Sequence, residues 1–156
     1  MEIILASNSP RRKQIMQKMG LSFDVIPSNY DEKLETDTFS YDLSEDLATQ
    51  KALDVVRRTD KNKIVIGADT VVVLHNKILG KPKTKEMAFN MLSDLSGQTH
   101  SVVTSICGIN TRTNRAALIS TTSYVRFNKL TDKQINDYIN RFEEMKQRKQ
   151  DFLALK

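Results

Sequence analysis

IVIGADTVVVL, residues 64–74, is the stretch that decides the fold of this chain. Its two apolar runs, residues 64–66 and 71–74, are rich in β-branched side chains and predict a central strand or a pair of strands. Between them lies Asp69, an aspartate inside an apolar segment. Burying such a carboxylate is costly unless it is paired, hydrogen-bonded or bound to a metal.

Two interpretations of Asp69 follow from the residues alone. It can hold Mg²⁺ or orient a water for attack on phosphorus. Alternatively, residues 67–70 form a turn between two short strands, with Asp69 as its Asx cap. Gly67 allows either a bulge or the close approach of a ligand backbone.

The flanking segments alternate between strand and helix patterns. A serine N-cap followed by Pro10 predicts the start of a helix, and Gly20 predicts its end. Interleaved elements with one long hairpin predict a single α/β domain, residues 1–156, with a mixed sheet flanked by helices. The predicted strands are residues 3–6, 23–27, 78–79, 101–109 and 116–127 beside the central segment, and the predicted helices are 9–20, 43–56, 84–95 and one opened by a Thr131–Gln134 capping box.

Bulk composition excludes several classes of protein. A chain of 156 residues with 39% hydrophobic and 28% charged residues is typical of one soluble domain. It has no apolar run near the roughly 20 residues needed to span a membrane, and its first residues do not form a signal peptide, so we expect a cytoplasmic protein. Its single cysteine, Cys107, is expected to be a buried thiol in a reducing compartment. The net charge of +5 is compatible with a phosphate-bearing partner, although much of the excess lies in residues 141–149.

Residues 7–13, SNSPRRK, lie where a strand passes into a helix. The N-terminus of a helix binds phosphate well, Arg11 and Arg12 can fork onto phosphate oxygens, and Ser9 can add a hydroxyl. The alternative is an ordinary N-cap followed by a solvated basic turn. Because cations are unfavourable in a first helical turn, three in a row indicate an anion nearby.

Three further side chains are weaker candidates. Lys81 lies between Gly80 and Pro82 and suits a point-charge contact to phosphate, but by itself it reads as a plain loop lysine. Lys51, on the helix of residues 43–56, can reach a site edge or extend into solvent. Glu32, with the aspartate before it, can be a metal carboxylate or part of a turn. We assign no role to the two histidines.

Five motifs, taken together and in this order, resemble the Maf nucleotide pyrophosphatases, the septum formation inhibitor family. The resemblance runs over residues 3 to about 139. The motifs are LASNSPRR at residues 5–12, QKA at 50–52, GADTVV at 67–72, LGKP at 79–82 and LSGQTH at 95–100.

The resemblance implies a fold related to inosine triphosphate pyrophosphatases, a divalent metal (Mg²⁺ or Mn²⁺), a nucleotide substrate and release of pyrophosphate. It implies that Asp69 is the catalytic base and that Glu32 and Asp69 hold the metal. The GADT form of the central motif is similar to the subgroup that acts on dTTP and UTP. The other implied substrate-binding residues are Arg12 and Thr70 for the base and Ser9, Arg11, Lys51 and Lys81 for the phosphates. A homodimer is also compatible with the family.

Residues 141–156 depart from the family pattern, which continues with a turn, a KAGYGIQ-like strand and a further strand. No counterpart exists for the family's C-terminal specificity glutamine. We hypothesise a frameshift, because the codons of residues 148–151 in another frame can encode Lys-Ala-Gly. Sequencing the gene tests this, since absence of an open frame encoding the strand would refute it. Loss of that strand would expose a sheet edge and part of the base pocket.

Two rival functions remain at this point. One is a basic nucleic-acid-binding module, although such a module predicts aromatic residues among its basic ones, and aromatic residues make up only 6% of the chain with no tryptophan. The other is a family remnant that binds nucleotide or a protein without turnover.

Overall fold

A computed structural model describes residues 1–154 of the protein, with the side chains of residues 1–148. In this part of the chain a six-stranded mixed sheet has the order β2-β1-β3-β5-β6, and β4 pairs with β3. The first strand runs parallel to both of its neighbours, and the remaining pairs are antiparallel. The elements are β1 (Glu2–Leu5), α1 (Pro10–Lys18), β2 (Phe23–Val25), α2 (Tyr41–Val56), β3 (Lys63–Leu74), β4 (Lys77–Leu79), α3 (Lys85–Leu95), β5 (Thr99–Asn110), β6 (Arg115–Arg126) and α4 (Asp132–Ala154).

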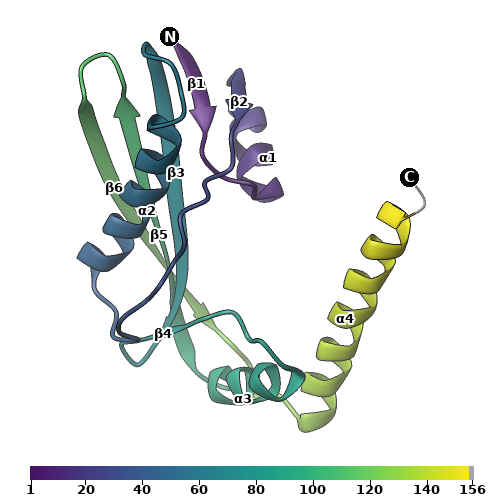
Figure 1. Ribbon diagram of the computed structural model, residues 1–156. Helices are drawn as coiled ribbons and strands as arrows, with labels where there is room; N and C mark the ends of the chain where they lie inside the picture. The colour runs from purple at the N-terminus through teal and green to yellow at the C-terminus, as the bar shows by residue number, and fades with distance from the viewer. Residues whose placement is uncertain (155–156) are drawn as a thin grey trace.

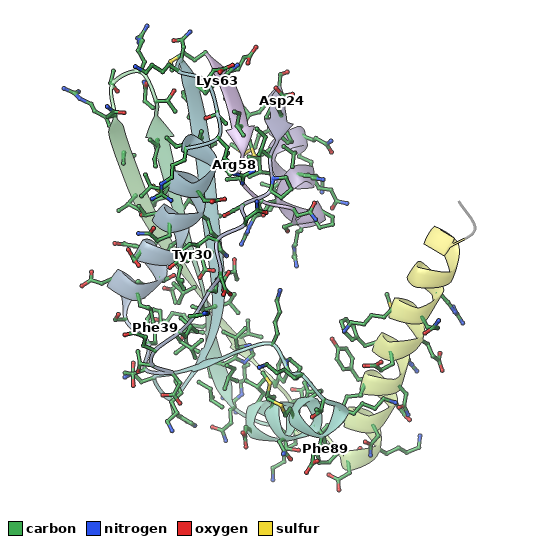
Figure 2. The ribbon with its side chains drawn as sticks, viewed as in Figure 1. Asp24, Tyr30, Phe39, Arg58, Lys63 and Phe89 are labelled. Carbon is green, nitrogen blue, oxygen red and sulfur yellow. The ribbon has the colours of Figure 1, made fainter. Side chains whose placement is uncertain are left out.

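The helices cover the sheet unevenly (Figure 1). Helix α2 lies along β3 and β5, whereas α1 lies beside β1 and β2. Helices α3 and α4 contact each other at the far end of β3, and α4 projects away from the sheet. Figure 2 shows Tyr30 and Phe39 on the long connection that leads into α2, and Phe89 on α3. The predicted α/β class with a mixed sheet is confirmed.

Local sequence signals account for most element boundaries. Ser9 is the N-cap of α1, with Pro10 at the first helical position, and Gly20 has a φ of +74° just beyond the helix. The capping box at the start of α4 is formed, because Thr131 N–H donates to Gln134 Oε1 at 2.9 Å and Gln134 N–H donates to Thr131 Oγ1 at 3.2 Å. The element types predicted from the sequence are therefore correct.

The central segment forms one continuous strand, β3, of 12 residues. The alternative of a turn at residues 67–70 is wrong, because the pairing with β5 continues through these residues and places Asp69 opposite Ser105. The β-branched residues at 64–66 and 70–73 favour strand structure on both sides of Asp69, so the strand continues through it.

Gly67 is needed for packing between helix and sheet. A Cβ at this position would lie 2.5 Å from Ala48 O and 2.6 Å from Ala52 N of α2. The predicted bulge or ligand approach is therefore wrong, because it is the backbone of α2 that comes close. Ala48 and Ala52 also belong to the main core cluster between α2 and the sheet. Its members are Ile4, Ala6, Ala48, Ala52, Val55, Val65, Cys107 and Ile109. Cys107 is fully buried as predicted, and burial raises the pKa of its thiol.

The neighbours of β3 change along its length, and this change creates the site. On one edge, β1 pairs with β3 as far as Ile66, and β4 begins its pairing only at Val72. Among residues 1–154, no strand pairs with this edge of β3 at residues 67–71. The edge of the sheet is therefore open beside Asp69.

Helix α4 continues well beyond the predicted last helix and includes residues 141–154. Ile135 and Ile139 are buried, while Tyr138 is exposed. No helix in the described part of the chain combines the length and apolar character needed to cross a membrane.

Candidate active site

One ammonium group links two carboxylates at the open edge of β3. Lys51 extends from α2, Asp69 lies on β3, and Glu32 lies on the connection between β2 and α2. Lys51 Nζ is 2.8 Å from Asp69 Oδ1 and also contacts Glu32 Oε1. The Asp69 side chain is only 3% exposed, whereas that of Glu32 is 44% exposed. The cluster therefore has a buried end at Asp69 and an open end at Glu32.

The second oxygen of Asp69 lacks a partner. Asp69 Oδ2 is buried, and no group in the described part of the chain donates a hydrogen bond to it. A buried acceptor left unpaired is costly, so such an oxygen usually binds an ordered water, an ion or a ligand group. This oxygen is available to a water, a metal ion or a donor on a substrate.

Arg12 spans the gap between the end of β1 and the middle of β3. Its Nη1 donates to Ser7 Oγ at 2.9 Å, and its Nη2 donates to Thr70 Oγ1 at 3.2 Å. Thr70 Oγ1 in turn lies 2.9 Å from Thr104 Oγ1 on β5. Burial lowers the pKa of the Arg12 guanidinium below its ordinary value, and the charges of Asp69 and Glu32 oppose that shift. The guanidinium is thus held in place beside the carboxylates.

The structure brings together five of the eight predicted site residues, namely Glu32, Lys51, Asp69, Arg12 and Thr70. The hydroxyl of Ser9 accepts the N–H of Arg12 at 3.4 Å, which is its role as N-cap. Arg11 and Lys81 are exposed, and neither side chain has a hydrogen bond or ion pair with another described residue. Their contact with phosphate stays a prediction.

A comparison with known protein families shows which family shares this sequence. The model of the family described as "Maf-like protein" matches residues 2–148. The chain belongs to the Maf-like protein family. Among its relatives is the dTTP/UTP pyrophosphatase of Clostridium perfringens strain ATCC 13124, 45% identical over 148 residues, which are 93% of this chain and 76% of the relative. The dTTP/UTP pyrophosphatase of Alkaliphilus oremlandii is 43% identical over 144 residues, covering 92% and 74% of the two chains.

Solved structures share the fold of this Maf-like protein at low identity. A nucleoside-triphosphatase / dITP/XTP pyrophosphatase from Mycobacterium abscessus superposes with a TM-score of 0.53 and 16% identity, covering 81% of this chain and 74% of that one. The Ham1 protein of Staphylococcus aureus gives a TM-score of 0.53 and 17% identity, covering 81% and 71%. The predicted relationship to the inosine triphosphate pyrophosphatase fold is confirmed.

The carboxylates of this Maf-like protein suit a divalent metal that is shared with a substrate. Among the described residues, no group of three or more His, Cys, Asp or Glu side chains is placed to hold a metal by itself. However, Mg²⁺ is commonly bound by one or two carboxylates, with waters and substrate phosphates completing its shell. Asp69 and Glu32 supply two carboxylates on either side of one ammonium, and Asp69 Oδ2 is an unused oxygen donor. These donors fit such an ion.

Several residues around this Maf site could not be assigned from the sequence. Ser7 and Thr104 hold Arg12 and Thr70, and Ser44, Ser105 and Ser120 form a hydrogen-bonded line from α2 across β5 to β6. One sequence signal was available, because Ser44 lies among the apolar positions that α2 turns to the sheet. The others depend on strand register, which spacing does not give.

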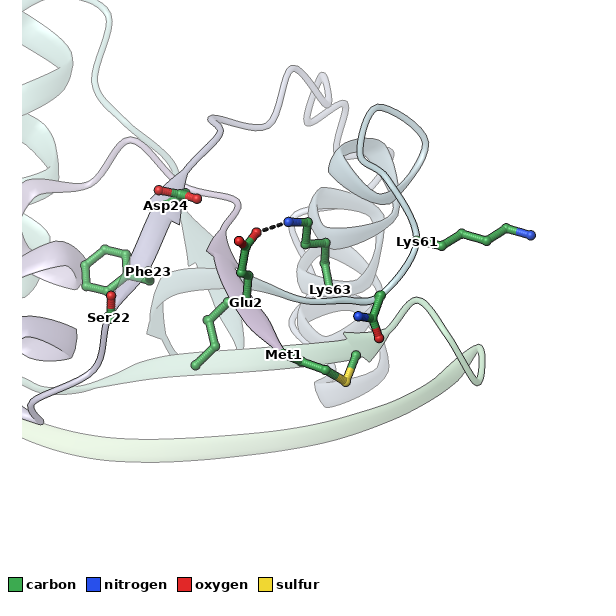
Figure 3. A pocket seen from close by; sticks show the side chains of 9 residues that line it. Met1, Glu2, Ser22, Phe23, Asp24, Lys61 and Lys63 are labelled. Atoms are coloured by element: carbon green, nitrogen blue, oxygen red, sulfur yellow. Dashed lines mark ion pairs between the residues drawn. The ribbon is translucent and has the colours of Figure 1, made fainter.

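Two hollows elsewhere on the surface do not include these residues. One of about 690 Å³ lies at the opposite end of the sheet, where Lys63 pairs with Glu2 (Figure 3). Another of about 520 Å³ lies where α3 and α4 meet the segment after β6, and Leu92, Phe127 and Tyr138 are among its lining residues. We assign no ligand to either.

Proposed function

We propose that this Maf-like protein hydrolyses dTTP and UTP to the nucleoside monophosphate and pyrophosphate. The observation that carries the proposal is the buried Asp69 with its unpartnered Oδ2, at an open sheet edge beside Lys51 and Arg12. The relatives named dTTP/UTP pyrophosphatase, more than 40% identical over most of the chain, support the choice of substrate.

Asp69 acts as the general base. Its Oδ2 accepts a proton from a water molecule, and the oxygen of that water forms a bond to the α-phosphorus. The bond between the α-phosphorus and the bridging oxygen breaks, and pyrophosphate leaves with the electron pair. Lys51 keeps Oδ1 occupied, so that Oδ2 is the oxygen that accepts the proton.

Fixed cations carry the charge of the triphosphate. Arg12 and Lys51 line the gap, and Lys81 and Arg11 together with Ser9 are proposed to contact the phosphates once substrate binds. Glu32 and Asp69 would hold a divalent cation (Mg²⁺ or Mn²⁺), which when bound neutralises phosphate charge. Phosphoryl transfer depends largely on such positioning and electrostatics.

Arg12 and Thr70 are proposed to contact the base. Their mutual hydrogen bond and the Thr70–Thr104 contact restrict the orientation of both donors. A site with hydrogen-bonding groups fixed in this way rejects a base whose polar groups do not match.

The cellular setting follows from this substrate. We propose a cytoplasmic enzyme consisting of one domain, residues 1–156, that acts on the free nucleotide pool, and a homodimer is compatible with this role. Cys107 is free and buried, which is compatible with a reducing compartment.

A nucleotide panel with Mg²⁺ tests the proposal, with pyrophosphate release measured for wild type and for Asp69→Asn. We expect turnover of dTTP and UTP, and a loss of roughly 10²–10⁴-fold in the variant. Asp94→Asn on α3 is the matched control, because this aspartate is exposed, makes no ion pair with Lys51 and has no part in the proposed mechanism. Nucleotide binding without turnover would instead support a family remnant, and salt-sensitive DNA binding alone would support the basic module.

A further inference from the structure

Two threonines on neighbouring strands form a hydrogen bond next to Arg12. Thr70 of β3 and Thr104 of β5 lie directly opposite each other in the antiparallel pairing, and their Oγ1 atoms are 2.9 Å apart. Hydrogen bonds between opposite threonines are among the side-chain contacts that stabilise antiparallel strands. Thr70 is exposed, whereas Thr104 is half-buried on a strand that pairs with both β3 and β6. Thr104 is therefore the better fixed of the two side chains.

Hydrogen bonds set the orientation of the Thr70 hydroxyl. A threonine side chain occupies staggered rotamers that place its hydroxyl in different directions. Because Thr70 is exposed, packing does little to select among them. Its hydroxyl contacts Thr104 Oγ1 at 2.9 Å and accepts from Arg12 Nη2 at 3.2 Å. Without Thr104, the orientation of Thr70 would depend on Arg12, a long side chain that itself has to be held.

Arg12 is held at two points of its guanidinium group. Nη1 donates to Ser7 Oγ at 2.9 Å, and Nη2 donates to Thr70 Oγ1 at 3.2 Å. Ser7 is only 7% exposed and also accepts the N–H of Ser9, so its surroundings fix this anchor. The anchor at Thr70 is exposed and is fixed through Thr104. A planar guanidinium held at one point can rotate there, whereas two contacts hold its plane.

We propose that Thr104 is a positioning residue that orients the hydroxyl of Thr70 and, through it, the guanidinium of Arg12. The inference rests on the proposed function, in which Arg12 and Thr70 contact the base. Donors held in one orientation distinguish bases by the positions of their polar groups, and donors that can turn distinguish them less well. Thr104 thus contributes to substrate choice through Thr70.

Two substitutions at Thr104 separate its hydroxyl from its shape. Thr104→Val keeps the shape and removes the hydroxyl. We expect it to lower the ratio of kcat/KM for dTTP over a purine nucleoside triphosphate about fivefold, which is part of the effect of one hydrogen bond. Thr104→Ser keeps the hydroxyl and should preserve the wild-type ratio. If the side chain acts only by packing, valine rather than serine preserves the ratio, and that order would overturn the inference.

Thr121→Val is the matched control for these substitutions. Thr121 lies opposite Thr104 on β6, is exposed, and takes no part in the hydrogen bonds of Thr70 to the described residues. Its substitution should leave the ratio unchanged. A fall equal to that of Thr104→Val would show that any threonine on this part of the sheet has the effect, and it would overturn the inference.

The double variant Thr70→Val/Thr104→Val tests whether Thr104 acts through Thr70. Without the Thr70 hydroxyl, Thr104 has no hydrogen bond through which to orient Arg12. We therefore expect the ratio for the double variant to equal that for Thr70→Val alone. A further fall on adding Thr104→Val would show an action of Thr104 that does not pass through Thr70, and the inference would be wrong.

Rotation of the Arg12 guanidinium tests the positioning without turnover. In protein with ¹⁵N-labelled arginine and no nucleotide, the Nε resonance of Arg12 is assigned by its loss in Arg12→Lys. We expect rotation about the Nε–Cζ bond, measured by exchange between the two Nη atoms, to be about fivefold faster in Thr104→Val and unchanged in Thr104→Ser. Equal rates in wild type and Thr104→Val refute the positioning role. A wild-type protein that hydrolyses no nucleotide refutes the proposed function instead, and the rotation rates still show whether Thr104 holds Arg12.

Discussion

Lys51 and Asp69 form an ion pair between helix α2 and strand β3, with Nζ 2.8 Å from Oδ1. Their side chains are only 16% and 3% exposed, so neither charge is well solvated. Removing one partner of a buried ion pair leaves the charge of the other partner buried and unpaired. We expect Lys51→Met to lower the free energy of unfolding by about 3 kcal/mol, measured by urea denaturation at pH 7.

Two comparisons check the cause of this loss. Lys33→Met removes a lysine that pairs with Asp31 at 3.8 Å on the exposed surface, and it is expected to change stability by less than about 1 kcal/mol. Adding Asp69→Asn to Lys51→Met removes the uncompensated charge and should restore part of the stability. A double variant that is less stable than either single variant would contradict this explanation.

The contact between α2 and Gly67 gives a second prediction. In Gly67→Ala the new methyl group would meet backbone atoms of Ala48 and Ala52 at 2.5 and 2.6 Å. Backbone cannot move aside as a flexible side chain does, so we expect a loss of about 3 kcal/mol or more in unfolding free energy. Gly108→Ala on β5 is the control, because a Cβ there meets nothing within 4 Å. Equal effects of the two substitutions on thermal stability would show that the close packing is not the cause.

The sequence was informative where local chemistry decides the structure. The N-cap at Ser9, the capping box at Thr131 and the β-branched residues of β3 predicted their elements correctly. Gly67 was misinterpreted because its partner is a helix 15 or more residues away in sequence, and no local pattern identifies what approaches a glycine.

The connection that carries Glu32 is tied to α2 by Asp54. Asp54 Oδ2 accepts the N–H of Asn29 at 2.9 Å and pairs with Arg58 at 2.8 Å. The hydrogen bond from Asn29, followed by that from Arg58, lowers the pKa of Asp54 below its ordinary value of 3.8. In the acidic range the unfolded chain therefore binds a proton at this residue more readily than the folded protein does.

Because the pKa of Asp54 is lower in the folded protein than in the unfolded chain, its carboxylate stabilises the fold at pH values above the unfolded-state pKa. This contribution is lost as the pH falls through the lower pKa of the folded state. The difference in unfolding free energy between wild type and Asp54→Asn should be complete at neutral pH and shrink below pH 3.8. Urea denaturation at a series of pH values measures it, and Asp60→Asn on the exposed turn after α2 is the control. A difference that stays constant from neutral to strongly acidic pH would refute the role of Asp54.

The hydroxyl of Thr70 gives a prediction about substrate choice. Thr70→Val keeps the shape of the side chain but removes its hydrogen bonds to Arg12 and Thr104. If Arg12 and Thr70 contact the base, the ratio of kcat/KM for dTTP over a purine triphosphate should fall about tenfold, which is the effect of one hydrogen bond. Thr122→Val removes a hydroxyl that contacts Tyr41 and should leave the ratio unchanged. A Thr70→Val enzyme with unchanged selectivity would exclude this role.

The candidate site was predictable in part. Asp69 stood out because a carboxylate interrupts an apolar run, whereas Lys51 and Glu32 were weak candidates from the residues alone and gained their roles from the resemblance to the family. Contacts such as Arg12 with Ser7, or Ser44 with Ser105, depend on how a helix sits on a sheet and on strand register. Neither is encoded in the spacing of residues along one segment. Arg11 and Lys81 are exposed without contacts to the site, so their roles depend on a bound substrate.

Hydrolysis of dTTP in water enriched in ¹⁸O tests the central claim most directly, because it identifies the phosphorus atom that the water attacks. Mass spectrometry of the products locates the label. A water activated by Asp69 at the α-phosphorus places ¹⁸O in the monophosphate and leaves the pyrophosphate unlabelled. Label found in pyrophosphate, or release of inorganic phosphate and dTDP, would contradict the proposed reaction.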